Sequence, residues 1–167
     1  MSGVAERLES LVRRAVAAMA RIPHSLIAFV ARFSIAGVFW QSGQTKVENF
    51  AIDLVGGTVQ LGWPRLGPST VDLFRDEYRL PLIPPEIAAP LAAIAEHVFP
   101  ALILIGLATR FSALALLIMT LVIQTLVYPG AWPTHGTWIA IFLYLMARGP
   151  GVLSVDHLIA RHCAQRP

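Results

Sequence analysis

Two long apolar runs, residues 87–107 and 111–128, are separated only by the polar turn Ala108-Thr109-Arg110. Each run is long enough to cross a bilayer as a helix, which takes about 20 residues. Because the turn between them is so short, the pattern predicts two neighbouring antiparallel helices. Glu96 and His97 lie in the middle of the first run, and ionisable side chains at that depth are costly. We therefore expect other residues of the chain to provide polar partners for Glu96 and His97.

Composition agrees with a membrane protein. The chain is 56% hydrophobic and only 14% charged, whereas soluble domains carry about 25% charged residues. Two further apolar runs flank the central pair, and the last of them is short. The sequence predicts an all-α membrane protein, a four-helix transmembrane bundle with spans at residues 22–41, 86–107, 111–128 and 134–147.

The remaining segments give the domain organisation. Residues 1–21 are predicted to form a basic amphipathic helix in the headgroup region, because apolar residues recur at helical spacing among arginines. Residues 22–157 form the membrane domain, and residues 158–167 form a polar tail. Within the domain, residues 47–85 form a cap between the first two spans. Gly56-Gly57 favours a β-hairpin there, although a short re-entrant segment has a similar pattern. A capping box at Ser69 and Asp72 predicts a short helix at 71–78.

Basic residues predict the orientation of the bundle. They lie before span 1, in the turn between spans 2 and 3, and after span 4, whereas the cap has more acidic than basic residues. Both termini are therefore expected in the cytoplasm and the cap in the periplasm, in a bacterial inner membrane. No basic stripe is interleaved with aromatic residues, so nucleic acid is not an expected partner. The flanking basic residues are Arg7, Arg13, Arg14, Arg21, Arg110, Arg148, Arg161 and Arg166.

A count of helix depth predicts a partner for Glu96. Arg32 and Glu96 each lie about ten residues into their spans, so at 1.5 Å per residue both are expected near the middle of the membrane. Since the guanidinium stays charged and its fork suits a carboxylate, the two are predicted to pair. The pair either locks span 1 to span 2 or makes Glu96 a proton or ligand site.

Several polar residues are expected to converge on the outer half of the bundle. Such a cluster beneath a cap is typical of a small-molecule pocket, and structural hydrogen bonds are the alternative for each member. Glu96 and His97 are the candidates for proton exchange. The candidate ligand-binding residues are Arg32, Gln41, Lys46, Gln124, His135 and Trp138.

Metal and haem binding fit the sequence less well. His97 and His135 differ in depth, and neither has a second ligand at helical spacing. Met119 and Met146 could bind copper, but methionine in apolar helices is usually packing. Cys163 is the single cysteine, so an internal disulfide and a CxxC motif are both excluded. No confident metal site is predicted.

Several short motifs resemble those of DoxX-type membrane proteins. They include Gly43-Gln-Thr-Lys46 directly after span 1, Glu96-His97-Val-Phe-Pro100 in span 2, and the Gly149-Pro-Gly151 turn before Ser154-Val-Asp156. Together these motifs extend over residues 30–157. The resemblance implies a four-helix membrane protein associated with quinone-linked redox systems. It also implies relatives in systems for copper-binding modified peptides.

The leading functional hypothesis is an accessory subunit of a quinone-linked redox complex, with a polar small-molecule pocket in the outer leaflet. Its partners would be the lipid membrane and a larger membrane protein complex. One alternative is a structural or assembly subunit that docks a larger complex without a ligand of its own. Another is a component of copper or metal-peptide handling. Whether the chain is an enzyme stays open.

Overall fold

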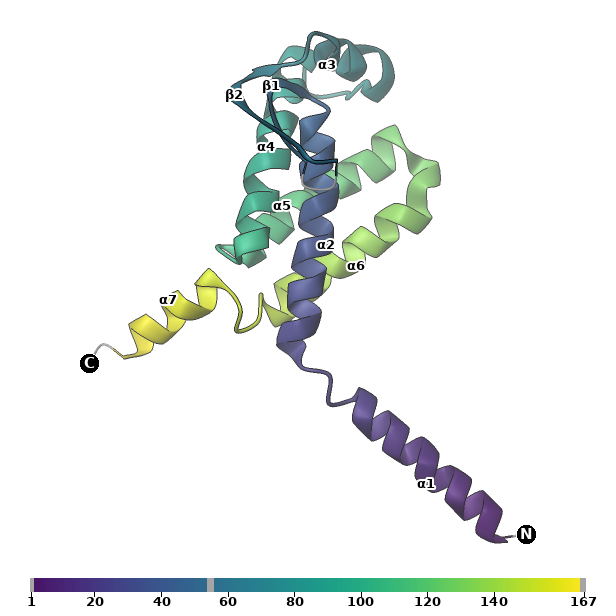
Figure 1. The fold of residues 1–167 in the computed structure, drawn as a ribbon. Coiled ribbons are helices and arrows are strands. Elements are labelled where there is room, and N and C mark those ends of the chain that lie inside the picture. The colour runs from purple at the N-terminus through teal and green to yellow at the C-terminus, as the bar shows by residue number, and fades with distance from the viewer. Residues whose placement is uncertain (1, 54–55, 166–167) are drawn as a thin grey trace.

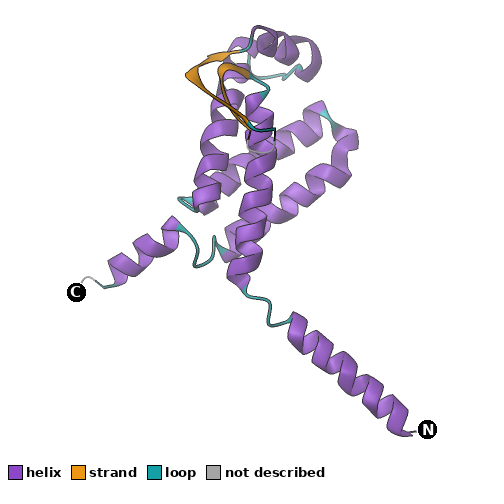
Figure 2. Ribbon diagram, viewed as in Figure 1, coloured by secondary structure: helices purple, strands orange, loops and turns teal. Residues whose placement is uncertain are grey.

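The computed structural model describes residues 2–53 and 56–165. Within this part the protein is mostly helical, with one two-stranded sheet (Figures 1 and 2). Arg166, counted above among the flanking basic residues, lies outside the described residues.

Three helices are long and apolar enough to cross a membrane. They are α2 (His24–Gln44), α4 (Pro85–Ile105) and the helix that runs from α5 (Thr109–Val122) into the π-turn η2 (Ile123–Val127). After the short turn η3 (Pro129–Ala131), α6 (Trp132–Arg148) packs against α5. With 17 residues, α6 is shorter than the other three, so the predicted fourth helix is present but the candidate spans number three among the described residues.

One apolar core joins these four helices. Its buried side chains come from all of them, so the helices pack as a bundle rather than as two separate hairpins. Small residues let the helices approach closely, as is common in membrane bundles. The core residues are Ile35, Ala36, Phe39, Ile103, Ala113, Leu116, Leu117, Phe142 and Leu145.

Gly43 marks a close contact between α2 and α4. A Cβ atom there would lie 2.9 Å from the His97 ring and 3.0 Å from the Glu96 carbonyl oxygen. That carbonyl faces α2 without its usual helical donor, because Pro100, four residues later, has no N–H. Glycine therefore lets the two helices meet where the hydrogen-bond ladder of α4 is open.

The cap consists of a β-hairpin and a short helical segment. Strands β1 (Val47–Asp53) and β2 (Thr58–Leu66) pair antiparallel, so the predicted hairpin is confirmed over the re-entrant alternative. The helix α3 (Pro68–Leu73) continues as the π-turn η1 (Phe74–Tyr78) and packs on the first turns of α4.

The predicted capping box at Ser69 is wrong. The helix begins at Pro68, with Gly67 as its N-cap and no side-chain cap, so Ser69 already lies inside the first turn. The start is set instead by the fixed φ of proline, which suits the first helical position.

Both termini leave the bundle at the end opposite the cap (Figure 1). The predicted N-terminal helix is α1 (Ser2–Met19), which stands away from the bundle. The expected polar tail is in fact a helix, α7 (Val155–Ala164). Its N-cap Ser154 accepts a hydrogen bond from the His157 N–H, the interaction that starts many helices.

Candidate functional site

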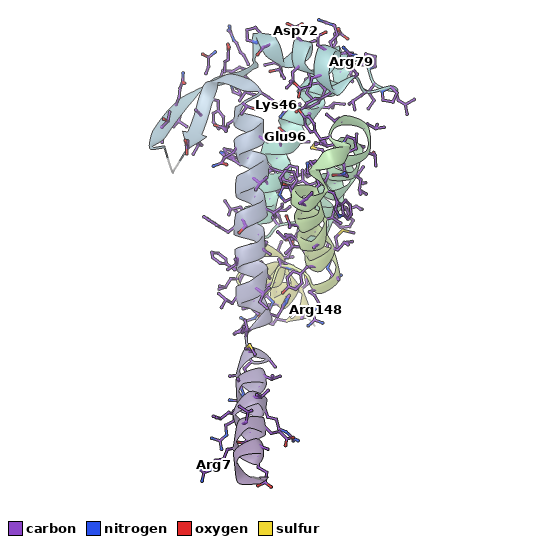
Figure 3. All side chains as sticks on the ribbon, turned by 90° about the vertical axis from the view of Figure 1, so that its right-hand side faces the viewer. Arg7, Lys46, Asp72, Arg79, Glu96 and Arg148 are labelled. Carbon is purple, nitrogen blue, oxygen red and sulfur yellow. The ribbon has the colours of Figure 1, made fainter. Side chains whose placement is uncertain are left out.

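Glu96 pairs with Lys46, not with Arg32. Glu96 Oε2 lies 2.7 Å from Lys46 Nζ, and both side chains are about 97% buried. Lys46 Nζ also donates to the carbonyl oxygen and the hydroxyl of Ser42, at 3.2 and 3.1 Å. Figure 3 shows the two charged side chains together at the cap end of the bundle. The predicted Arg32–Glu96 pair is therefore wrong.

Arg32 lies at the other end of α4. Its guanidinium donates to the carbonyl oxygens of Leu104, at 2.9 Å, Ile103, at 3.4 Å, and Leu153. It thus caps the end of α4 and ties that end to the segment before α7. Lys46 follows Arg32 by 14 residues and lies just beyond the end of α2, a separation of roughly 20 Å at 1.5 Å per residue. The depth count failed because α4 starts beyond the end of α2, where the cap covers it.

His97 is held by a chain of hydrogen bonds. Its Nδ1 lies 2.7 Å from the Ala93 carbonyl oxygen, and its Nε2 lies 2.8 Å from Gln44 Nε2. The carbonyl can only accept and the amide nitrogen can only donate, so the tautomer with its hydrogen on Nδ1 suits both contacts. Gln44 in turn accepts from the Ile52 N–H at 2.8 Å. His97 therefore anchors β1 to the helices through Gln44.

The hydrogen bond between Gln44 and Ile52 leads to a testable prediction. Gln44→Ala should remove the acceptor of the Ile52 N–H and speed hydrogen exchange at that amide about tenfold, for a hydrogen bond worth about 1.4 kcal/mol. Gln41→Ala is the matched control, because Gln41 lies one turn earlier, is exposed and makes no hydrogen bond within the described part of the chain. Equal exchange of Ile52 in both variants would contradict the hydrogen-bond chain.

A second polar group lies between η2 and α6. His135 Nδ1 lies 2.7 Å from Gln124 Oε1, and Gln124 Nε2 donates to the Pro129 carbonyl oxygen at 2.7 Å. The His135 and Trp138 rings are 4.9 Å apart, and Trp138 packs on the core residue Phe39. These three predicted residues are brought together, but around the turn that joins α5 to α6 rather than around Glu96.

Glu96 lines an apolar groove between α4 and α5. The groove has a volume of about 480 Å³ and is closed at the cap end by η1. Among the described residues around it, only Glu96 and Tyr78 have side-chain oxygen atoms, and the others are aliphatic, aromatic or Met119. None of the other predicted ligand-binding residues lines it. The principal apolar lining residues are Phe74, Leu91, Phe99, Ile118, Ile123 and Val127.

Tyr78 was not among the site residues predicted from the sequence. Its ring lies 5.9 Å from that of Tyr128, whose hydroxyl donates to Glu77 Oε1. Burial, together with the nearby Glu96 charge, raises the pKa of Tyr78. This network ties the cap to the end of the third span. The sequence shows an aromatic residue in the predicted cap helix, and only the structure places it against Tyr128.

The Tyr128–Glu77 contact predicts a pH dependence. The hydrogen bond to Glu77 raises the pKa of Tyr128 above its ordinary value. A phenol whose pKa is raised by folding stabilises the fold fully below its unfolded pKa of about 10, and this contribution is lost as the pH rises toward the folded pKa. Unfolding titrations from pH 8 to 11 should show a steeper loss of stability in the wild type than in Tyr128→Phe. Identical slopes would contradict the contact.

Metal ligands do not gather in the part of the chain that the structure describes. No group of three or more histidine, cysteine, aspartate or glutamate side chains there could hold an ion. His97 and His135 use their Nδ1 atoms within the separate hydrogen-bond groups described above. The geometry therefore offers no support for assigning these histidines to one metal or haem.

Comparison with known proteins identifies the family. Searches of curated proteins and of solved structures gave no match. The family model described as DoxX matches residues 27–129, which is more than half of the chain and includes α4, α5, the cap and most of α2. The chain therefore belongs to the DoxX family of membrane proteins.

Proposed function

We propose that this DoxX-family protein is an accessory subunit of a quinone-linked redox complex in a bacterial inner membrane. The observation that supports the proposal best is the groove between α4 and α5. Its volume of about 480 Å³ lies within the range of small-molecule pockets, which are mostly apolar with a few polar groups. A lipid-soluble molecule with an apolar tail and a polar ring suits such a lining.

The residues of the groove fit a quinone in two respects. The aliphatic walls of α4 and α5 would hold an apolar tail, and the Tyr78 hydroxyl and the Glu96 carboxyl are the groups that could contact a ring oxygen. No aligned hydrogen bond from the described residues reaches Glu96 Oε2, although Lys46 lies beside it. In this proposal, Glu96 exchanges a proton with the ligand, Lys46 holds the carboxylate, and a bound quinone supplies the redox chemistry.

The groove also revises the predicted set of ligand-binding residues. Arg32 and His97 have protein partners and lie outside the lining, so we assign them to the stability of the bundle. Gln124, His135 and Trp138 form a group of their own, and Gln41 is exposed. The proposal therefore depends on Glu96 and Tyr78.

Retention of quinone tests the proposal. Protein purified from its native membrane in mild detergent should carry quinone that chromatography detects in the lipid extract. Ala115→Phe, which fills the groove from α5, should remove most of it. Glu96→Gln should weaken retention and reduce the activity of the copurified complex. Ile105→Phe is the matched control, because Ile105 is exposed and does not line the groove. Absence of quinone in the wild type would refute the proposal.

A structural subunit without a ligand is the second candidate function. Arg32, His97 and Lys46 each have a partner within the protein, and this favours a structural function. Their contacts connect the helices and the cap without any ligand. If Ala115→Phe leaves both the assembly and the activity of the partner complex intact, the structural function is the correct one.

A further inference from the structure

The β-hairpin carries an exposed apolar strip. Val59, Leu61 and Trp63 occupy alternate positions of β2, and their exposed fractions are 63%, 75% and 85%. Large side chains in such a row on one strand are unusual for a surface that faces water, since scattered single residues are the normal case. A two-stranded hairpin is also only marginally stable in water by itself. We therefore expect another apolar surface to cover this strip.

Two residues of the strip, Leu61 and Val59, share their face of the sheet with residues of β1 next to the bundle. Leu61 is the register partner of Phe50, and Val59 is the partner of Ile52, so these four side chains lie on one face. The Phe50 ring lies 6.2 Å from Trp40 on α2 and 6.1 Å from His97 on α4. One edge of this face thus rests on the helices, and β2 extends beyond them.

The hairpin also doubles back along α2. The Ile52 N–H donates to Gln44 Oε1 at 2.8 Å, and the Ile52 carbonyl accepts from Trp40 Nε1 at 3.0 Å. Ile52 therefore lies level with the last turn of α2, although the chain has already left that helix. Figure 3 shows the hairpin descending beside α2 from the cap. This turn belongs to a helix that is long and apolar enough to span a membrane, so the hairpin lies beside one end of a candidate span.

We propose that the hairpin lies on the bilayer beside α2, with Val59, Leu61 and Trp63 inserted at the boundary between headgroups and acyl chains. The face continues directly from the lipid-facing surface of α2 through the Trp40–Phe50 contact. The register partners Glu48 and Arg65 lie at the base of the hairpin, whereas Val59 and Leu61 lie nearer its turn. Tryptophan is enriched at this depth, where its ring is partly in lipid and its N–H is hydrated. A lipid surface therefore fits this face better than a polar protein surface does.

Neighbouring residues of β2 provide a matched test. Leu61 and Gln60 are both exposed but point to opposite faces of the strand. In a Cys163→Ser background, Leu61→Cys and Gln60→Cys can each carry a nitroxide in the full-length protein in bilayers. The ratio of collisions with dissolved oxygen to collisions with a water-soluble nickel complex then reports depth. Val59→Cys gives an independent reading on the same face as Leu61.

The expected result is an oxygen-to-nickel ratio several-fold higher at positions 61 and 59 than at position 60. Equal, water-like ratios at all three positions would overturn the proposal, because the face would then lie in water. Low collision rates with both reagents at positions 61 and 59 would also overturn it, since they would show that a protein, either a partner or a second copy, covers the face. Neither outcome depends on whether the groove binds quinone.

Discussion

Lys46→Met alone should lower the free energy of unfolding by about 3–5 kcal/mol, the usual cost of leaving one member of a buried ion pair without its partner. The Lys46 and Glu96 side chains are both about 97% buried, and their charged atoms are 2.7 Å apart. Without the ammonium group, Glu96 would remain as a buried charge among apolar residues. Unfolding in mixed micelles with increasing denaturing detergent would measure the loss.

The double variant Lys46→Met with Glu96→Leu should recover most of this stability, because replacing both members of a buried pair with apolar residues is often neutral or stabilising. The exposed pair Arg75–Glu86, at 2.9 Å, provides the control. Arg75→Met should leave stability almost unchanged, since exposed ion pairs contribute little. If Glu96→Leu rescued a substitution of Arg32 but not of Lys46, the pairing described here would be wrong.

Arg32→Leu should lower the free energy of unfolding by at least about 3 kcal/mol, because hydrogen bonds from a charged donor contribute about 1.5–3 kcal/mol each. The guanidinium is buried and donates to three carbonyl oxygens, two at the end of α4 and one on Leu153. The loss should add to that of Glu96→Leu without coupling, because sites this far apart are independent.

The same substitution has a local signature. Arg32 holds the Leu153 carbonyl, so its loss should loosen the segment that leads into α7. Cys163, exposed near the end of α7, can carry a nitroxide whose mobility should increase in Arg32→Leu. Arg148→Leu is the matched control, because Arg148 is exposed and has no hydrogen bond or ion pair within the described residues. A stable, equally mobile Arg32→Leu protein would show that the capping of α4 is unimportant.

The ends of the helices were predicted to within a few residues where proline, glycine or charge marks them. Pro85 starts α4, and Gly106, with φ of +72°, ends it in the left-handed region that glycine tolerates. The π-turn at the end of α5 and the helix α7 were missed. Hydrophobic periodicity does not distinguish a π-turn from an α-helix, and α7 is too polar to stand out beside the spans.

The candidate site was predicted only in part. Arg32, Phe39 and Gly43 share one face of α2 at helical spacing and are buried in the bundle, and Lys46, just beyond the helix, is buried too. Arg32 rather than Lys46 was predicted as the partner of Glu96. This was wrong because counting from the start of each span assumes that all spans begin at one depth. The groove could not be predicted, since it arises where α4, α5 and η1 leave space between apolar side chains.

The sequence alone determined the membrane class and the order of the membrane helices. These follow from hydrophobic length and period, which act along the chain and need no knowledge of neighbours. Only the tertiary structure decided which buried charges meet. The stagger of α2 against α4 is set by the close contact at Gly43 and by the cap that covers the start of α4. Because of that stagger, Glu96 lies next to Lys46, and Arg32 donates instead to backbone carbonyl oxygens at the end of α4. The groove lies beside the Glu96 carboxylate.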